Sequence, residues 1–336
     1  MSRLPDWYRS EAPIAPGATP RPSTSRAIRN WIRARLPDPD VRGKTIVLYA
    51  RRGLRKKSAW AGMFSEFHHA LGALVYGERR GAAGLRIDFR SALYVDPRRG
   101  PNWWTYFFTR SELRLRDAAP AGEVHLTHRL AKYGRYGGFC DLVNGRTPYL
   151  YPMTYGVGRA DLHRLVRTHV EVRSEIQCEV DGIVSSAFVP GAFVVGVHYR
   201  GTDSTHSALG LVNDYRIAPV PYALYLDEVR RAIAKSAPAR YQVLVATDER
   251  DFVEFMRREI GDEHVVCVED APRTSAGGAA IHFDRTLGVS NYEKGRSGLI
   301  DCLLLARSSY LVKGRSNLSD ASLVFNETLP YSLCLR

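Results

Sequence analysis

The sequence predicts an α/β protein with two domains, each organised around a largely parallel sheet. The chain has 336 residues, more than a single hydrophobic core usually covers. Residues 44–89 contain a strand, a helix and a second strand in succession, as in a βαβ unit. Over 193–326, strand-like apolar runs again alternate with helical patterns, which is typical of a parallel sheet covered by helices. We therefore expect domains over 41–180 and 181–336, preceded by an irregular proline-rich arm over 1–40.

The spacing of apolar residues defines the N-terminal elements. Residues 44–50 (KTIVLYA) predict the first strand, and 62–80 has apolar residues three and four apart, which predicts a helix packed on the sheet. Gly62, in the loop before that helix, is the residue suited to close approach of an anion to the helix start. Because neighbouring residues of a helix point in different directions, we expect His68 and His69 to be core or helix-surface histidines rather than to share a metal.

The middle of the chain is less regular. Residues 91–110 hold six aromatic side chains in a turn-rich segment, which we interpret as core beneath a loop rather than as a wall that stacks on carbohydrate. Residues 117–160 are expected to be rich in loops. From Asp161, which we expect to act as the cap, one long amphipathic helix is expected to lead towards the central strand of the second sheet.

Charged residues gather where the predicted C-terminal strands end. The apolar run 193–197 is followed at once by His198, Arg200 and Asp203, and the next strand, YQVLVA, is followed by Asp248. Ligands of open α/β sheets bind beyond the carboxyl ends of the strands. The planar guanidinium of Arg200 suits a phosphate or a carboxylate. Pairing of Arg200 with Asp203 at the strand end is an alternative interpretation of equal weight.

Further along, a helix is expected over 297–307 with a serine cap, then a strand, SSYLVKG. The following helix would begin at Ser316 and Asn317, which offer hydroxyl, amide and backbone N–H groups together and so suit a phosphate. Two polar segments, 204–221 and 270–295, are expected to be loops, and the first is long enough to be a functional loop.

Composition narrows the classes of function. The net charge of +13 favours an anionic partner, namely nucleic acid, an acidic membrane or a phosphorylated small molecule. The densest basic cluster, 51–57, lacks interleaved aromatic residues, so we interpret it as a solvated loop. No apolar run approaches the roughly 18 residues that cross a bilayer, and the N-terminus lacks a signal-peptide core, which predicts a cytoplasmic protein. Five scattered cysteines without a CxxC pair indicate neither a zinc site nor a disulfide framework.

Three segments occur in order on strand–helix edges of the second predicted sheet: VVGVHYRGTD, LVATDERD and LIDCLLLARSSYLVKGRSNLS. Their order and spacing resemble the motif regions of the fucosyltransferase superfamily that includes the α-1,6-fucosyltransferases of N-glycan cores and the nodulation-factor (NodZ-type) fucosyltransferases. GMFSEFHHALGALVYGERRGAAGLRIDF resembles the loop, helix and strand of the N-terminal half of that family. The resemblance spans about 44–330 and implies a GT-B fold, with two Rossmann-like domains facing each other across a cleft.

The resemblance also implies inverting transfer of L-fucose from GDP-fucose to a carbohydrate or related hydroxyl, without a metal or a further cofactor. Arg200 matches the arginine that binds the β-phosphate, where a guanidinium stabilises charge as it develops on the departing GDP. Asp301 falls on the carboxylate that binds guanine, and Ser316 and Asn317 fall on the phosphate-binding turn. The other residues expected to bind the donor are His198, Asp203, Asp248 and Gly62.

The sequence departs from the family at the general base that an inverting displacement needs. Ala208 stands at the position that holds a glutamate base in the core fucosyltransferases. Asp214, through a shifted alignment, and His206 are the candidate bases. The family's second N-terminal glycine is Phe64 here, and its second motif arginine is Gly201.

Three alternatives stay open. A transferase for another GDP-linked sugar would use the same carboxylate and arginine. A catalytically silent protein that binds nucleotide sugar or carbohydrate is favoured by Ala208 and would bind the donor without turnover. A nucleic-acid binder would instead show binding that weakens steeply with salt, with no preference among nucleotide sugars.

Overall fold

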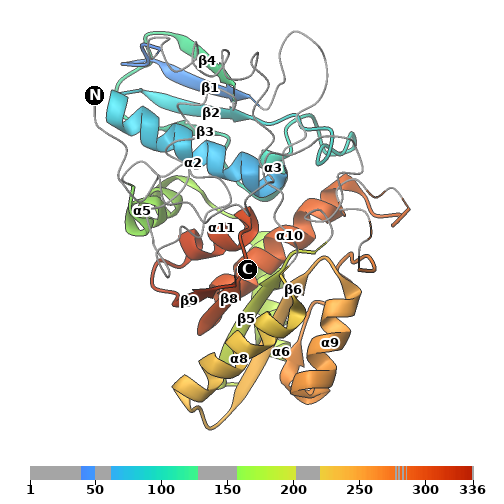
Figure 1. Ribbon diagram of the computed structural model, residues 1–336. Helices are drawn as coiled ribbons and strands as arrows, with labels where there is room; N and C mark the ends of the chain where they lie inside the picture. The colour runs from blue at the N-terminus through green and yellow to red at the C-terminus, as the bar shows by residue number, and fades with distance from the viewer. Residues whose placement is uncertain are drawn as a thin grey trace, which may run out of the picture.

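The computed structural model describes residues 39–49, 62–127, 157–201 and 220–334, apart from six positions between 277 and 285. The basic cluster at 51–57 and almost all of the expected N-terminal arm lie outside the described residues. The α/β architecture expected from the sequence is confirmed, with one sheet in each half of the chain and helices between and around the sheets (Figure 1).

The N-terminal sheet has four strands in the order β3-β2-β1-β4. The predicted βαβ unit is present: β1 (Thr45–Tyr49) and β2 (Gly84–Asp88) are parallel, and α2 (Met63–Arg80) connects them. The strand β3 (Glu112–Arg114) pairs antiparallel with β2. The strand β4 (Glu123–Thr127) lies parallel to β1, within a stretch expected to be loops. The sequence did not predict this strand, because its pairing is supplied by the backbone edge of β1 and not by a local apolar pattern.

The C-terminal sheet has five parallel strands in the order β7-β6-β5-β8-β9. Its strands are β5 (Phe193–Tyr199), β6 (Tyr241–Thr247), β7 (Val265–Val266), β8 (Tyr310–Lys313) and β9 (Tyr331–Leu333). The helices that follow or join them are α8 (Tyr222–Ser236), α9 (Arg250–Ile260), α10 (Asn291–Ala306) and α11 (Asn317–Phe325). The chain first adds strands on one side of β5 and then returns to its other side with β8, so the strand order reverses between β5 and β8.

Both faces of this sheet are buried, which explains the continuous apolar runs in its strands. Alternate residues of β5 contribute to two different apolar cores: Val195 and Val197 pack with α8 and α9, while Val194 packs with α10 and α11. Gly196 allows close packing, because a Cβ there would lie 2.5 Å from Ser308 Oγ at the end of α10.

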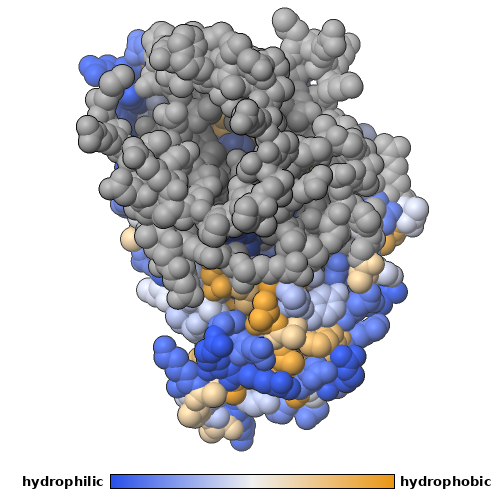
Figure 2. Space-filling model, viewed as in Figure 1, coloured by the Kyte–Doolittle hydropathy of each residue, from blue (hydrophilic) through white to orange (hydrophobic). Residues whose placement is uncertain are grey.

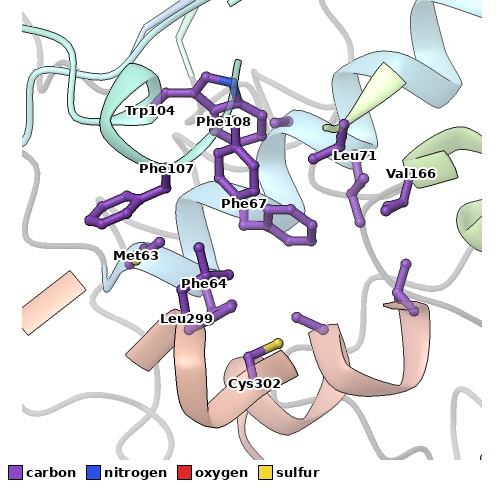
Figure 3. Packing of buried hydrophobic residues seen from close by; sticks show 14 of the residues in the cluster. Met63, Phe64, Phe67, Leu71, Trp104, Phe107, Phe108, Val166, Leu299 and Cys302 are labelled. Atoms are coloured by element: carbon purple, nitrogen blue, oxygen red, sulfur yellow. The ribbon is translucent and has the colours of Figure 1, made fainter. Parts of the chain in front are cut away.

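One apolar core joins the two sheets. Phe67 of α2 stacks on Phe325 of α11, with ring centroids 5.6 Å apart. Figure 3 shows Phe67 beneath Phe108 and Trp104, and Phe64 of α2 beside Leu299 of α10. Trp103, Trp104, Phe107 and Phe108 are all buried, which confirms the core interpretation of 91–110. Because this core is continuous, the domain boundary near residue 180 stays a prediction.

The expected single helix from Asp161 is in fact two helices, α5 (Arg159–His169) and α6 (Ser174–Ala187). The residues between them pair with the aromatic segment: Thr109 N–H donates to the Glu171 carbonyl and Arg173 N–H donates to the Phe107 carbonyl, both at 2.9 Å. These tertiary hydrogen bonds replace helical ones, and the helix is interrupted. Asp161 lies in the first turn of α5, whose N-cap is Gly158.

The helix α10 begins earlier than expected. Its N-cap is Ser290 rather than Ser297, and Ser290 forms a capping box with Glu293. The hydroxyl of Ser290 accepts from the Glu293 N–H at 3.2 Å, and the Glu293 carboxylate accepts from the Ser290 N–H at 2.8 Å. The S-x-x-E pattern at 290–293 is the sequence signal that would have found this start.

Of the described helices, none is both long and apolar enough to cross a membrane. The described surface around α8 and α9 in the lower part of Figure 2 is largely hydrophilic, with smaller apolar areas between the charged residues.

Candidate functional site

The carboxyl ends of β5, β6 and β8 are in register. His198 of β5 lies beside Ala246 of β6 and Lys313 of β8, and neighbouring strands of a sheet are about 4.8 Å apart. Arg200 therefore emerges next to the turn that follows β8, at the reversal of strand order where open α/β sheets bind ligands. His198 itself is buried at this edge, and Arg200 is partly buried.

The turn after β5 is fixed by the residues that follow β6. The N–H of Gly201 donates to Asp248 Oδ1 at 3.0 Å. A Cβ at Gly201 would overlap the carboxylate of Glu249, so a larger residue there would have to displace that side chain. Glu249 is buried and accepts a hydrogen bond from the Tyr222 hydroxyl at 2.6 Å. Asp248 thus shapes the loop that carries Arg200, and the space beside Gly201 is filled by Glu249, which sequence reasoning did not select.

The turn between β8 and α11 carries two unsatisfied polar atoms. Ser316 is the N-cap residue of α11, yet its side chain makes no capping hydrogen bond. Ser316 Oγ and Asn317 Oδ1 are buried and have no hydrogen-bond partner among the described residues. Leaving a buried polar atom unsatisfied costs about 1–3 kcal/mol, which a ligand that binds both atoms would recover.

An ion pair lies directly beneath this turn. Lys313 Nζ of β8 and Asp320 Oδ1 of α11 are 2.6 Å apart, and both side chains are 0% exposed. Asp320 is in the first turn of α11, so the pair ties the end of the strand to the start of the helix. Ser316 and Asn317 lie in the chain between the two residues that this pair links.

Asp301 projects from α10 without accepting a hydrogen bond from any described residue. It keeps some accessible surface, but the protein atoms packed around its carboxyl raise its pKa to about 7. The nearby Arg273 guanidinium acts in the opposite direction, and the Asp248 charge raises the pKa further. Asp301, Asp248 and Arg273 therefore lie within electrostatic reach of one another.

Arg273 is a second residue that sequence reasoning missed. It follows β7, and its neighbour Thr274 is held against the end of β6: the Thr274 N–H donates to the Asp248 carbonyl, and the Arg250 N–H donates to the Thr274 carbonyl, both at 2.9 Å. The Arg273 guanidinium donates to the Val268 carbonyl at 2.7 Å, while its buried Nε has no partner among the described residues. No sequence motif marks this arginine.

The helix α2 faces the same turn from the N-terminal half. His68 is buried, as expected, and its Nε2 donates to the backbone carbonyl of Asn317 at 3.0 Å. Gly62 is the N-cap of α2, but its φ of −65° suits any residue, and a Cβ there would lie 3.8 Å from the Tyr94 hydroxyl, an ordinary contact. Close approach to an anion is thus not a steric requirement at Gly62.

The remaining candidates fall outside the described residues. Asp203, His206, Ala208 and Asp214 all lie within 202–219. Within the described ranges, no three histidine, cysteine, aspartate or glutamate side chains gather as a metal site.

No protein-family model matches the chain, and no curated protein matches it by sequence. Solved structures do. The chain is 18% identical to the selenomethionine form of fucosyltransferase NodZ from Bradyrhizobium, with a TM-score of 0.50 over 84% of this chain and 92% of that one. With NodZ α-1,6-fucosyltransferase soaked with GDP-fucose, the sequence identity is 18% and the TM-score is 0.48, over 84% of this chain and 92% of that one. With POFUT1 in complex with GDP-fucose, the sequence identity is 11% and the TM-score is 0.45, over 89% of this chain and 99% of that one.

The likeness to the selenomethionine NodZ structure shows that the chain has a fucosyltransferase-like fold. The GT-B-like α/β architecture expected from the sequence motifs is thereby confirmed.

Proposed function

We propose that this protein is an inverting, metal-independent glycosyltransferase that transfers L-fucose from GDP-fucose to a hydroxyl of a carbohydrate acceptor. The observation that carries the proposal is the juxtaposition at the β5–β8 reversal. Arg200 emerges beside a helix start whose Ser316 Oγ and Asn317 Oδ1 are buried without partners among the described residues. The fold that the chain shares with the fucosyltransferase NodZ supports the same proposal.

Each donor group then has a partner of matching chemistry. Asp301 accepts the two N–H groups on the guanine edge, which adenine does not offer, and its carboxylate has no competing hydrogen bond from a described residue. The start of α11 binds the diphosphate through backbone N–H groups and the Ser316 hydroxyl. Arg200 binds the β-phosphate and stabilises the negative charge that develops as the sugar–phosphate bond breaks.

The acceptor hydroxyl must lose its proton as it attacks the sugar, so a general base completes the mechanism. We assign this role to Asp214, with His206 as the alternative. Both follow Arg200 within 14 residues of chain. Rate against pH for Asp214→Asn and His206→Gln separates them, because loss of the base removes the acidic limb of the profile, whereas a change confined to acceptor KM excludes that residue.

The test is a donor panel followed by turnover. Thermal shifts are compared for GDP, UDP, ADP, GDP-fucose and GDP-mannose, and GDP release is then followed with GDP-fucose. We expect the guanine nucleotides to stabilise the protein, GDP-fucose to be consumed, and Arg200→Lys to lose turnover. Equal shifts for GDP and ADP would contradict the role of Asp301.

A second candidate is a silent protein that binds nucleotide sugar, and Ala208 favours it because it replaces the expected base. Stabilisation by GDP-fucose with no GDP release across a broad acceptor panel would support this candidate over the transferase. Consumption of GDP-mannose in preference to GDP-fucose would instead identify a transferase for a different sugar.

A further inference from the structure

A polar pocket of about 490 Å³ lies between the segment before α3 (Trp104–Phe107) and the first turns of α10. Figure 1 shows the start of α10 rising towards that segment, and Asn291 Nδ2 joins the two by donating to the carbonyls of Ala92 and Val95 at 2.9 and 3.0 Å. The residues that line the pocket are Asp96, Arg98, Arg99, Ser290, Tyr292, Glu293 and Arg296. None of the residues proposed above to bind the donor is among them.

Arg99 is held in this pocket by stacking. Its guanidinium carbon lies 3.5 Å from the centroid of the Tyr292 ring. Tyr292 in turn stacks on the buried ring of Phe107, with centroids 5.4 Å apart and planes 10° apart. Gly295 permits this approach, since a Cβ there would lie 2.8 Å from Phe107. One face of the exposed Arg99 guanidinium is therefore covered by the Tyr292 ring, which is itself supported by the buried Phe107 ring.

Stacking occupies the face of a guanidinium and leaves its N–H groups at the edge. Among the described residues, the Arg99 side chain forms no ion pair within 4 Å and donates no hydrogen bond, and its close contact is the Tyr292 ring. The pKa of Asp96 is lowered mainly by the Arg98 N–H, and the Arg99 charge acts on it in the same direction from a longer distance. A planar fork of donors, already oriented, matches the two oxygens of a carboxylate.

The other charges that line the pocket are balanced by neighbours. Arg98 pairs with Asp96 at 3.3 Å, and Arg296 donates to Glu179 with Nε at 2.9 Å. The carboxylate of Glu293 accepts the Ser290 N–H in the capping box. Arg99 is thus the lining cation without a carboxylate contact among the described residues, and the N-terminal end of α10 adds positive potential beside it.

We propose that this pocket is a subsite for a sugar residue that bears a carboxylate, bound through a bidentate pair with Arg99. The volume and the charged, hydrogen-bonding lining suit a hydroxyl-rich ring rather than an apolar ligand. Assignment of that sugar to the acceptor chain rests on the proposed function. Binding of a carboxylated sugar at Arg99 is independent of the proposed function.

The experiment measures binding of D-glucuronate to the full chain by calorimetry at low ionic strength, with D-glucose as the neutral control of the same ring. We expect glucuronate to bind at least tenfold more tightly than glucose. Arg99→Gln should lose that preference, and Arg99→Lys should lose most of it, because an ammonium neither stacks nor offers a fork. Arg98→Gln combined with Asp96→Asn is the matched control: it removes a paired cation together with its carboxylate from the same pocket and leaves the net charge unchanged, so it should change binding less than twofold.

Three outcomes overturn the proposal. These are equal binding of glucuronate and glucose, unchanged glucuronate binding in Arg99→Gln, and binding of inorganic sulfate as tight as that of glucuronate, which would indicate a simple anion site. Because Arg99 is exposed, we expect its variants to keep the fold, and their unfolding temperatures are measured to check this.

The subsite and the proposed function can fail separately. GDP stabilisation without glucuronate binding removes the subsite alone, whereas glucuronate binding at Arg99 without any guanine-nucleotide binding removes the transferase alone. If both hold, Arg99→Gln raises KM for a carboxylated acceptor at least tenfold and leaves KM for GDP-fucose unchanged.

Discussion

Replacing Lys313 with methionine should destabilise the protein severely. Lys313 and Asp320 are 2.6 Å apart and both 0% exposed, so Lys313→Met leaves a carboxylate buried without its cation. Breaking a buried ion pair in this way costs about 3–5 kcal/mol. Lys313→Met with Asp320→Leu replaces the pair by apolar side chains of similar size, and such replacements are neutral or stabilising by about 1–4 kcal/mol. The double variant should therefore be more stable than Lys313→Met alone.

Urea unfolding at pH 7.5 gives the free energy of unfolding for the parent, both single variants and the double variant, and the cycle isolates the coupling between the two residues. A loss below about 1 kcal/mol in Lys313→Met, or additive losses in the double variant, would refute the argument that the pair acts as a unit.

Three further predictions concern single groups. The guanine contact that we propose for Asp301 uses the ionised carboxylate, and the pKa of Asp301 is raised to about 7, so GDP affinity should fall by up to about tenfold per pH unit below pH 7. Calorimetry over pH 5.5–8 should give a flat and weaker profile for Asp301→Asn. Arg200→Lys should abolish transfer with an unchanged unfolding temperature, while the control Arg240→Lys, which directly precedes the amino end of β6, should keep full activity. Comparable activity in the two variants would contradict the proposed phosphate-binding role of Arg200. Burial holds the pKa of Glu66 well above its usual value, so the contribution of Glu66 to stability is present at low pH and is lost as pH rises. Glu66→Gln keeps an acceptor for the Trp103 N–H, so in denaturant titrations this variant should be more stable than the parent protein at pH 8 and equally stable at pH 4.

The elements that the sequence predicted best are those whose pattern is local. The strands β5, β6 and β8 are compact apolar runs, and α2 has strong helical spacing, so each lies close to its expected position. The errors arose where tertiary pairing overrides local preference. The bridge between Phe108 and Val172 accompanies the break between α5 and α6, and pairing with β1 creates β4.

The residues of the candidate site likewise fall into those that the sequence predicted and those that it did not. Arg200, Asp248 and Ser316 could be found because each follows a predicted strand, and parallel strands end at one edge of a sheet. Glu249 and Arg273 could not. Glu249 matters because its carboxylate fills the space beside Gly201, and Arg273 matters because its charge acts on Asp301; these partners are 48 and 28 positions away in the chain.

By itself, the sequence determined the order of strands and helices and which polar residues follow the strands, because both depend on the spacing of apolar residues along the chain. Only the tertiary structure decided which buried charges meet, as in Lys313 with Asp320, and which cation is left facing a pocket, as in Arg99 on Tyr292. Such contacts depend on side-chain direction and on the packing of distant elements, and no local spacing encodes them.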